Sequence, residues 1–255
     1  MKTKLQLIIM SLVLLFMAGG QSVCHAADSW SYPTSKPDGK FGGGSGSYYD
    51  PYLINNAQQL ADLAYMVNHG EYFKGKYFKL TTDITLNDNV LNDDGTPNTS
   101  GTFQSWTPIG EFGVFSDDDF MGTFDGCGHT IRGFYMKDSK VQFSGLFGTV
   151  KEARVKNINM EDCLISSNFG VFARYDVQCA GILCGKAYRS SFNNIKVSRA
   201  LITKNGEGKH DVYLGGIIGR CYARDENWGQ VFLANSSFEG TISNVMVKRL
   251  KFPTL

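Results

Sequence analysis

Short apolar runs between small residues recur along the second half of the chain. SGLFG, AGILCG and LGGIIG, at residues 144–148, 180–185 and 214–219, share this form, and GTFDGCGHTIRGF at residues 122–134 combines four glycines with β-branched and aromatic residues. Glycine allows sharp backbone turns, whereas β-branched and aromatic residues favour extended strands. Each segment therefore predicts a strand, a corner and a second strand, and their recurrence predicts a stack of similar units.

The spacing of these units is nearly regular. The last glycines of the three apolar runs are Gly148, Gly185 and Gly219, which are 37 and 34 residues apart. Self-similarity with a period of about 20 to 50 residues is typical of solenoids and other repeat arrays. Alternation with period two, interrupted by glycine every few residues, excludes a helical solenoid.

The segments that follow these glycines can be aligned as well. RVKNINM, SFNNIKV and TISNVMV, at residues 154–160, 191–197 and 241–247, each place an asparagine before an isoleucine or valine. We expect the three segments to lie side by side and parallel, with their asparagines stacked in a ladder of amide hydrogen bonds. The sequence thus predicts an all-β fold, a parallel β-helix in which each repeat supplies about two coils.

A short helix is predicted near the start of this domain. Asn55 or Asn56 can cap a helix that ends near Gly70. Its apolar residues lie three and four positions apart, at Leu60, Leu63, Ala64 and Val67. In a stacked fold such a helix can cover the open first unit, so we interpret it as an N-terminal cap. An ordinary packing helix of an α+β domain is the alternative.

YFKLTTDITL, at residues 77–86, predicts a long strand or a strand pair.

The N-terminal residues predict export. Lys2 and Lys4 precede an apolar run at residues 5–18, and Ala26 provides a small residue for cleavage. This pattern is typical of a secretory signal peptide at residues 1–26. A retained membrane anchor and a lipid-modified Cys24 are the alternatives. We expect no membrane-spanning segment in the mature chain, which is then secreted or attached to the cell surface.

Residues 27–48 are rich in Ser, Gly, Pro and Lys and include FGGGSGS at residues 41–47. This composition predicts a flexible lead-in before a domain at residues 49–255.

The chain stops at KRLKFPTL, soon after a predicted strand. We therefore expect the C-terminal edge to be truncated, or to be covered by a further domain or subunit.

Charge and cysteine content narrow the classes of partner. The chain has 25 basic and 24 acidic residues, and loss of Lys2 and Lys4 leaves 23 and 24. A nearly neutral chain lacks the electrostatic signature of nucleic-acid binding.

Signal cleavage leaves five cysteines, whose spacing matches no zinc motif. We expect them to be core residues, although a disulfide among Cys179, Cys184 and Cys221 stays open.

Five stretches of the chain carry a family resemblance. They are DPYLINNAQQLADLAYMVNHG, GKYFKLTTDITL, WTPIG, GTFDGCGHTI and GLFG, at residues 50–70, 75–86, 106–110, 122–131 and 145–148. Together they resemble the bacterial secreted and surface proteins built from GLUG repeats. The resemblance covers nearly all of residues 49–250. It implies a right-handed parallel β-helix within a larger, adhesin-like surface protein, and it supplies no catalytic residues. Cys127 stands where the family usually has Asn, and Ile182 interrupts a common double glycine.

Candidate site residues come from the acidic clusters and from an insertion in the third repeat. Asp117, Asp118 and Asp119 are adjacent carboxylates that suit a calcium ion, although an exposed turn is the simpler interpretation. The polar loop at residues 87–101 is a second weak calcium candidate. Insertions in solenoids leave from one face, often the binding face. The insertion predicts ligand contacts at Tyr222, Arg224, Asp225, Glu226 and Trp228.

Three functions stay open on this sequence. The first is non-catalytic, adhesin-like binding of an extracellular glycan or a host or matrix protein, with no cofactor, and it requires exposed aromatic residues. The second is polysaccharide cleavage by a lyase or hydrolase, for which a groove could use Asp117–Asp119, Asp125, Arg132 and Lys137. It requires a convergent carboxylate pair or a carboxylate and a cation. The third is a structural stalk of a larger surface protein, which requires neither. We predict the first.

Overall fold

The computed structural model describes residues 27–111, 118–137, 141–167, 177–204, 211–222 and 230–243, and shows them to be mostly strands with one helix. The first strands and the helix are β1 (Tyr52–Ile54), α2 (Ala57–Val67), β2 (Tyr77–Leu80), β3 (Ile84–Thr85), β4 (Thr123–Asp125), β5 (Thr130–Arg132) and β6 (Tyr135–Lys137). The repeats contain β7 (Phe143–Ser144), β8 (Phe147–Lys151), β9 (Arg154–Ser167), β10 (Val177–Gly181), β11 (Cys184–Tyr188), β12 (Ser191–Lys204), β13 (Asp211–Gly215), β14 (Ile218–Cys221), β15 (Phe232–Ala234) and β16 (Ser237–Ser243).

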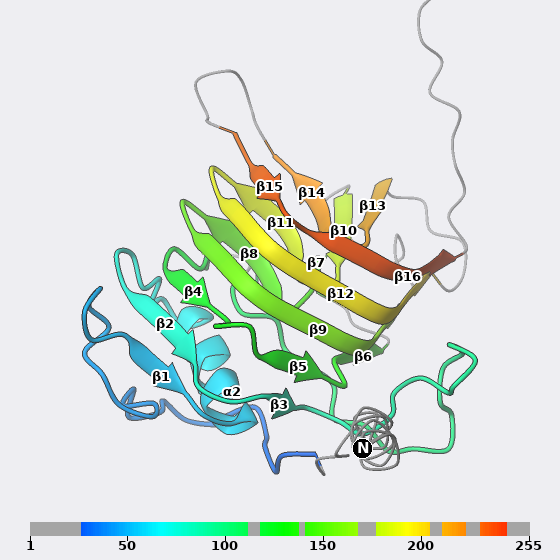
Figure 1. Cartoon of the computed structure of the whole chain (residues 1–255), viewed down its shortest axis with the longest axis horizontal. Helices are drawn as coiled ribbons and strands as arrows, with labels where there is room; N and C mark the ends of the chain where they lie inside the picture. Colours follow the sequence, from blue (N-terminus) through cyan, green and yellow to red (C-terminus); the bar gives the residue numbers. More distant parts are fainter. Residues whose placement is uncertain are drawn as a thin grey trace, which may run out of the picture.

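These strands form three sheets in which every pairing of strands is parallel. The largest sheet contains ten strands and runs β1-β2-β4-β9-β12-β15, with β3, β5, β6 and β16 pairing at its sides. The other two sheets are β7-β10-β13 and β8-β11-β14. Figure 1 shows successive strands of each sheet lying side by side along the length of the molecule. The fold is therefore all-β and parallel, with a β-helix-like arrangement.

Each repeat contributes one coil, not the two expected from the sequence. Arg154 lies opposite Ser191 in the β9–β12 pair, and Thr149 lies opposite Lys186 in the β8–β11 pair. Both offsets equal the 37-residue period, so that one repeat supplies one strand to each of the three sheets before the next begins. The expectation was wrong because β9 and β12 are 14-residue strands that continue through their corners.

The first two of the three aligned segments pair as predicted, but the third does not. Ser191 lies opposite Phe232, whereas Thr241 lies opposite Leu201, ten residues further along β12. The equivalent of SFNNIKV is therefore the segment FLANSSF at residues 232–238. The apolar pattern of TISNVMV matched it by composition, whereas hydrogen-bond register decides the true alignment. Asn244 lies outside the described residues.

Asparagine occupies a corner of the stack where the backbone is left-handed. Asn157, Asn194 and Asn235 have φ of 56°, 55° and 50°, and Cys127 in the β4–β5 connection has φ of 52°. Non-glycine residues rarely adopt positive φ, and Asn does so at the lowest cost. The corner therefore explains both the repeated asparagine and the unusual position of Cys127.

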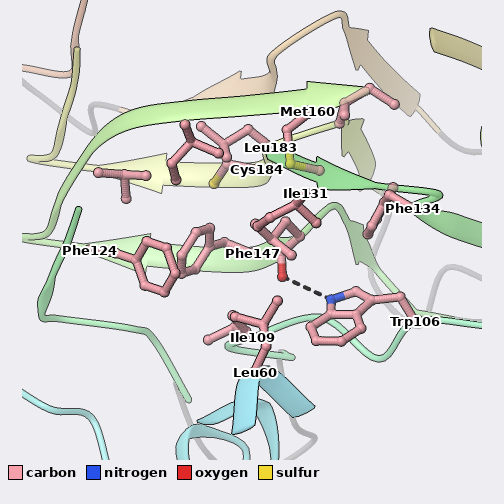
Figure 2. Packing of buried hydrophobic residues seen from close by; sticks show 14 of the residues in the cluster. Leu60, Trp106, Ile109, Phe124, Ile131, Phe134, Phe147, Met160, Leu183 and Cys184 are labelled. Carbon is pink, nitrogen blue, oxygen red and sulfur yellow. Dashed lines mark hydrogen bonds between the residues drawn. The ribbon is translucent and has the colours of Figure 1, made fainter. Parts of the chain in front are cut away.

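The core fills the space between the sheets and the helix. Phe78, Phe124, Val155 and Phe192 lie opposite one another in successive strands, and each is at most 1% exposed. Trp106 donates from Nε1 to the carbonyl oxygen of Leu146 at 3.1 Å, as Figure 2 shows, so that its one polar atom is paired inside the core. The five described cysteines are free thiols; three are buried, and Cys127 and Cys221 are exposed.

Helix α2 lies where the sequence predicted a helix. Asn56 is its N-cap and accepts a hydrogen bond from the backbone nitrogen of Gln59 at 3.0 Å. Its apolar stripe is fully buried in the core, and Leu60 points toward Ile109 in Figure 2. In Figure 1 the helix lies beside the first strands, at the end of the stack where the chain enters.

Residues 27–48 contain no helix or strand but pack against the first strands, which differs from the expected flexible lead-in. Trp30 donates from Nε1 to the carbonyl oxygen of Leu86 at 2.9 Å, and its ring centroid lies 5.3 Å from that of Trp106. Phe41 packs against Phe78 with ring centroids 5.4 Å apart. The sequence predicted a flexible segment because its few aromatic residues are scattered among small polar ones. Composition alone does not show that these aromatic residues pack against the sheet.

Candidate functional site

A hollow with aromatic walls lies on the outer face of β2, β4 and β9. It has a volume of about 510 Å³. Side chains alternate between the two faces of a strand, so the buried column through Phe78 and Phe124 leaves its neighbours facing outward. Tyr77 and Lys79 on β2, with their partners on β4 and β9, form the floor of this groove.

Tyr48 and Tyr49 form one wall and are highly accessible, at 67% and 94% exposed. The ring of Tyr48 meets the rings of Tyr49 and Tyr77 edge to face, with centroids 5.0 and 5.4 Å away. A tyrosine presents a large, rigid surface that is apolar on its face and polar at its tip, which suits recognition. Three such rings together form an aromatic surface that the fold leaves open to solvent.

The glycine-rich segment before these tyrosines is a tight turn that positions them. Gly44 has φ of 84°, and a Cβ atom there would lie 1.9 Å from the carbonyl oxygen of Pro51. The nitrogen of Tyr77 donates to the carbonyl oxygen of Gly46 at 3.0 Å, which ties the turn to β2. FGGGSGS is therefore a structural part of the groove, because only glycine fits where the two backbones meet.

The floor of the groove carries one carboxylate and an excess of cations. Asp125 accepts hydrogen bonds from Asn157 Nδ2 and from the nitrogen of Cys127, both at 2.9 Å, and its Oδ2 lies 2.9 Å from Lys156 Nζ. Lys79 and Arg154 also line the groove and form no ion pair with another described residue. The groove thus has three positive groups and one negative group.

Asp125 is held in its ionised form. Desolvation raises the pKa of this carboxyl, but the hydrogen bonds from Asn157, Lys156 and Cys127 outweigh it, so that the pKa is lowered overall. A general acid needs a raised pKa, and glycoside hydrolysis generally needs a second carboxyl group about 5 to 9.5 Å away. Asp125 is the single carboxylate among the groove-lining residues. The arrangement suits binding better than acid catalysis.

The other residues considered for cleavage are dispersed along β9. Asp125, Arg132 and Lys137 lie opposite positions 156, 161 and 166. Left-handed corners at Asn157 and Asp162 separate these three positions, so the side chains project from different stretches of the coil and do not converge. Arg132 is instead paired with Glu161, with Nη2 and Oε2 2.6 Å apart.

The calcium candidates occupy a buried position and not an exposed turn. Asp118 and Asp119 are each 5% exposed, and Asp119 Oδ2 lies 3.9 Å from Lys151 Nζ. Burial and the negative charge of Asp118 raise the pKa of Glu111. Asp117 lies outside the described residues. Among the residues that are described, no three His, Cys, Asp or Glu side chains form a group that could hold a metal ion.

The loop at residues 87–101 is attached to the sheet by a carboxylate. Asp162, in β9, accepts hydrogen bonds from the nitrogens of Val90 and Leu91 at 2.7 and 3.2 Å. Within the loop, Asp94 accepts from the nitrogen and hydroxyl of Thr96. These carboxylates fix backbone conformation, which is a structural task.

Of the predicted contact residues, Tyr222 is described and lies outside the groove, just after β14. Its ring centroid is 5.0 Å from that of Tyr188 and 5.0 Å from the ammonium of Lys186, and the guanidinium of Arg220 is 5.2 Å away. Arg224, Asp225, Glu226 and Trp228 lie outside the described residues. Tyr222 therefore belongs to a second, partly exposed aromatic and basic surface.

The tyrosines of the groove were not predicted from the sequence. A signal for them exists, because Tyr77 and Lys79 alternate with the buried Phe78 and Leu80, and Tyr48 and Tyr49 directly follow a glycine-rich turn. It was missed because only the fold brings the turn next to β2.

Comparisons with known proteins show partial likenesses. No protein-family model matches the chain. A "Putative Gly-rich membrane protein" of Evansella cellulosilytica is 31% identical over 121 residues, which are 47% of this chain and 12% of that protein. Halomucin of Haloquadratum walsbyi is 29% identical over 179 residues, 69% of this chain and 2% of that protein. The chain thus spans a small fraction of these relatives.

One solved structure resembles the chain. It is a "putative immunoglobulin A1 protease" from Bacteroides ovatus, with 19% identity and a TM-score of 0.42 over 85% of this chain and 69% of that one. None of the described helices is long and apolar enough to cross a bilayer.

Proposed function

We propose that this chain is a non-catalytic, adhesin-like binding module of a secreted or cell-surface protein, and that its ligand is an extracellular glycan bound in the groove beside Tyr48 and Tyr49. The observation that carries the proposal is the exposed tyrosine wall above a polar floor. Sugar rings have an apolar face and polar hydroxyl edges, which match aromatic faces and polar side chains respectively. A rigid parallel sheet beneath the groove keeps these groups in place before a ligand binds.

The finer architecture belongs to the same proposal. It includes a right-handed parallel β-helix of GLUG-repeat type that is exported by cleavage after Ala26. The parallel offset of 37 residues in the β9–β12 and β8–β11 pairs supports the β-helix, and the likeness to a named membrane protein and to halomucin supports a place at the cell surface. The single carboxylate of the groove and its lowered pKa support binding without cleavage. The exposed tyrosines favour binding over a purely structural stalk.

The test is a binding screen of the chain without residues 1–26 against immobilised glycans and matrix proteins. A Tyr48→Ala/Tyr49→Ala double variant should lose most of the glycan signal, whereas Tyr222→Ala on the second surface should keep it. Loss with Tyr222→Ala alone would move the site to the predicted insertion. Release of oligosaccharides would establish cleavage, and an absence of any ligand would favour the stalk.

A further inference from the structure

The groove continues as two rows of outward side chains that cross the strands. Register places Tyr77, Thr123, Arg154, Ser191 and Phe232 opposite one another in β2, β4, β9, β12 and β15. The neighbouring row contains Lys79, Asp125, Lys156, Asn193 and Ala234. Adjacent strands lie about 4.8 Å apart, so four steps from Tyr77 to Phe232 cover roughly 19 Å. We call these two rows the track.

Aromatic side chains stand at both ends of the track. Tyr77 contacts the exposed Tyr48 at one end, and Phe232 is 60% exposed at the other. Both belong to the same row and therefore project from the same face of the sheet. An exposed phenylalanine has no polar group of its own to favour water, so its position extends the binding surface well beyond the tyrosine wall. The ligand that fits is long, with successive units lying across successive strands.

The charge of the track is positive where the ligand would lie. Its charged residues are Lys79, Arg154, Lys156 and Asp125, and Asp125 is already paired with Lys156. Lys79 and Arg154 are exposed and make no ion pair with another residue of the described chain. A guanidinium can pair with a carboxylate through two parallel hydrogen bonds. The cationic centre between aromatic ends favours a polymer that carries carboxylates.

We propose that the ligand is a linear acidic polysaccharide that lies along the track, with a uronate carboxylate at Arg154 and sugar faces on Tyr77 and Phe232. This inference rests on the proposed function and adds the charge, length and direction of the ligand. A single-stranded nucleic acid also combines negative charge with stacking faces, and an oligothymidylate is the competing probe in the test.

The test is calorimetric titration of the full chain, freed of residues 1–26, with polygalacturonate and with its fully methyl-esterified form. Esterification removes the charges and keeps the sugar chain. We expect affinity for the esterified polymer to be at least about tenfold lower, since several exposed ion pairs worth up to about 1 kcal/mol each are lost. Binding of polygalacturonate should weaken as salt rises.

Matched variants locate the contact. Arg154→Gln and Lys79→Gln should each lower affinity for polygalacturonate about two- to fivefold, whereas Lys196→Gln, an exposed lysine of β12 outside the track, should leave it unchanged. Phe232→Ser should weaken binding of the polymer and not of a trisaccharide, because the shorter ligand does not reach β15.

Equal affinity for the charged and esterified polymers would overturn the inference and leave the proposed function intact. Tighter binding of an oligothymidylate would also overturn it. Failure to bind either polymer, together with no glycan in the screen, would overturn both.

Discussion

Asn194 donates a hydrogen bond from Nδ2 to Oδ1 of Asn157 at 3.0 Å, and the two residues occupy the same left-handed corner of successive repeats, with φ of 55° and 56°. Asn157 in turn donates to Asp125 in the preceding coil. This chain of side-chain bonds connects three coils at the edge of the groove. The corner that closes each coil is thus also part of the support for the candidate site.

The corner predicts an unusual order of mutational effects. Asn194→Gly should destabilise the fold less than Asn194→Ala, by about 1 kcal/mol. Both variants lose the side-chain hydrogen bond to Asn157, but only alanine has a steric clash at positive φ. Chemical denaturation measures the difference. Asn193→Ala, next to it but without positive φ, is the control and should have a small effect. A more stable alanine variant would contradict the assigned corner.

Asp162 should be important for stability. Asp162→Ala leaves the nitrogens of Val90 and Leu91 without their acceptor, and buried unpaired donors cost about 1–3 kcal/mol each. We expect a loss of about 2 kcal/mol or more in urea denaturation, with faster proteolysis between residues 92 and 98. Asp162→Asn retains one acceptor oxygen and should fall between wild type and alanine. Unchanged proteolysis in the alanine variant would show that another contact holds the loop.

Glu111 should make stability depend on pH. Burial, followed by the charge of Asp118, raises the pKa of Glu111 in the folded state. The folded state therefore binds the proton more tightly than the unfolded state, and stability falls as pH rises from the ordinary glutamate pKa through the raised one. Glu111→Gln should increase the Tm at pH 7, with a smaller gain at pH 4.

The control for Glu111 is Glu239→Gln, which removes an exposed carboxyl group on β16. Its Tm difference from wild type should be small at both pH values. A Glu111→Gln variant that is less stable than wild type at pH 7 would show that the carboxylate makes a favourable contact that outweighs its desolvation.

The cysteines predict a simple thiol count. Burial raises the pKa of Cys179 to about 11 and raises those of Cys163 and Cys184 as well, so that these thiols are both inaccessible and protonated. In the folded chain without residues 1–26, Ellman's reagent should react with two thiols, Cys127 and Cys221, and after unfolding it should react with all five. Three reactive thiols in the unfolded chain would instead reveal a disulfide.

The sequence predicted those features that local patterns determine. The cap at Asn56, the stripe through Leu60 and the pairing of RVKNINM with SFNNIKV follow from residue periodicity, and the structure confirms them. The place of the third segment could not be predicted, because its strand β15 is only three residues long and all three are exposed, so that it lacks the alternation of buried and exposed positions seen in strands such as β2. The apolar pattern gives little information on register in a strand without such alternation.

The candidate site was harder to predict, because it is assembled across coils. Tyr48 and Arg154 are more than one hundred residues apart in sequence and become neighbours only through the pairing of β2, β4 and β9. Tyr222 was predicted as a contact residue because it lies in an insertion of the third repeat. That prediction took no account of strand register, which decides which side chains lie together. Whether the second surface around Tyr222 also binds ligand stays a prediction.

Tyrosine-selective modification, followed by mass spectrometry of the chain with and without saturating polygalacturonate, tests the central claim most directly. Tyr48 and Tyr49 should be strongly protected by the polymer, whereas Tyr213, which is 40% exposed next to the second surface, should be modified at the same rate in both samples. Protection of Tyr213 with unchanged modification of Tyr48 and Tyr49 would contradict the assignment of the groove as the binding site.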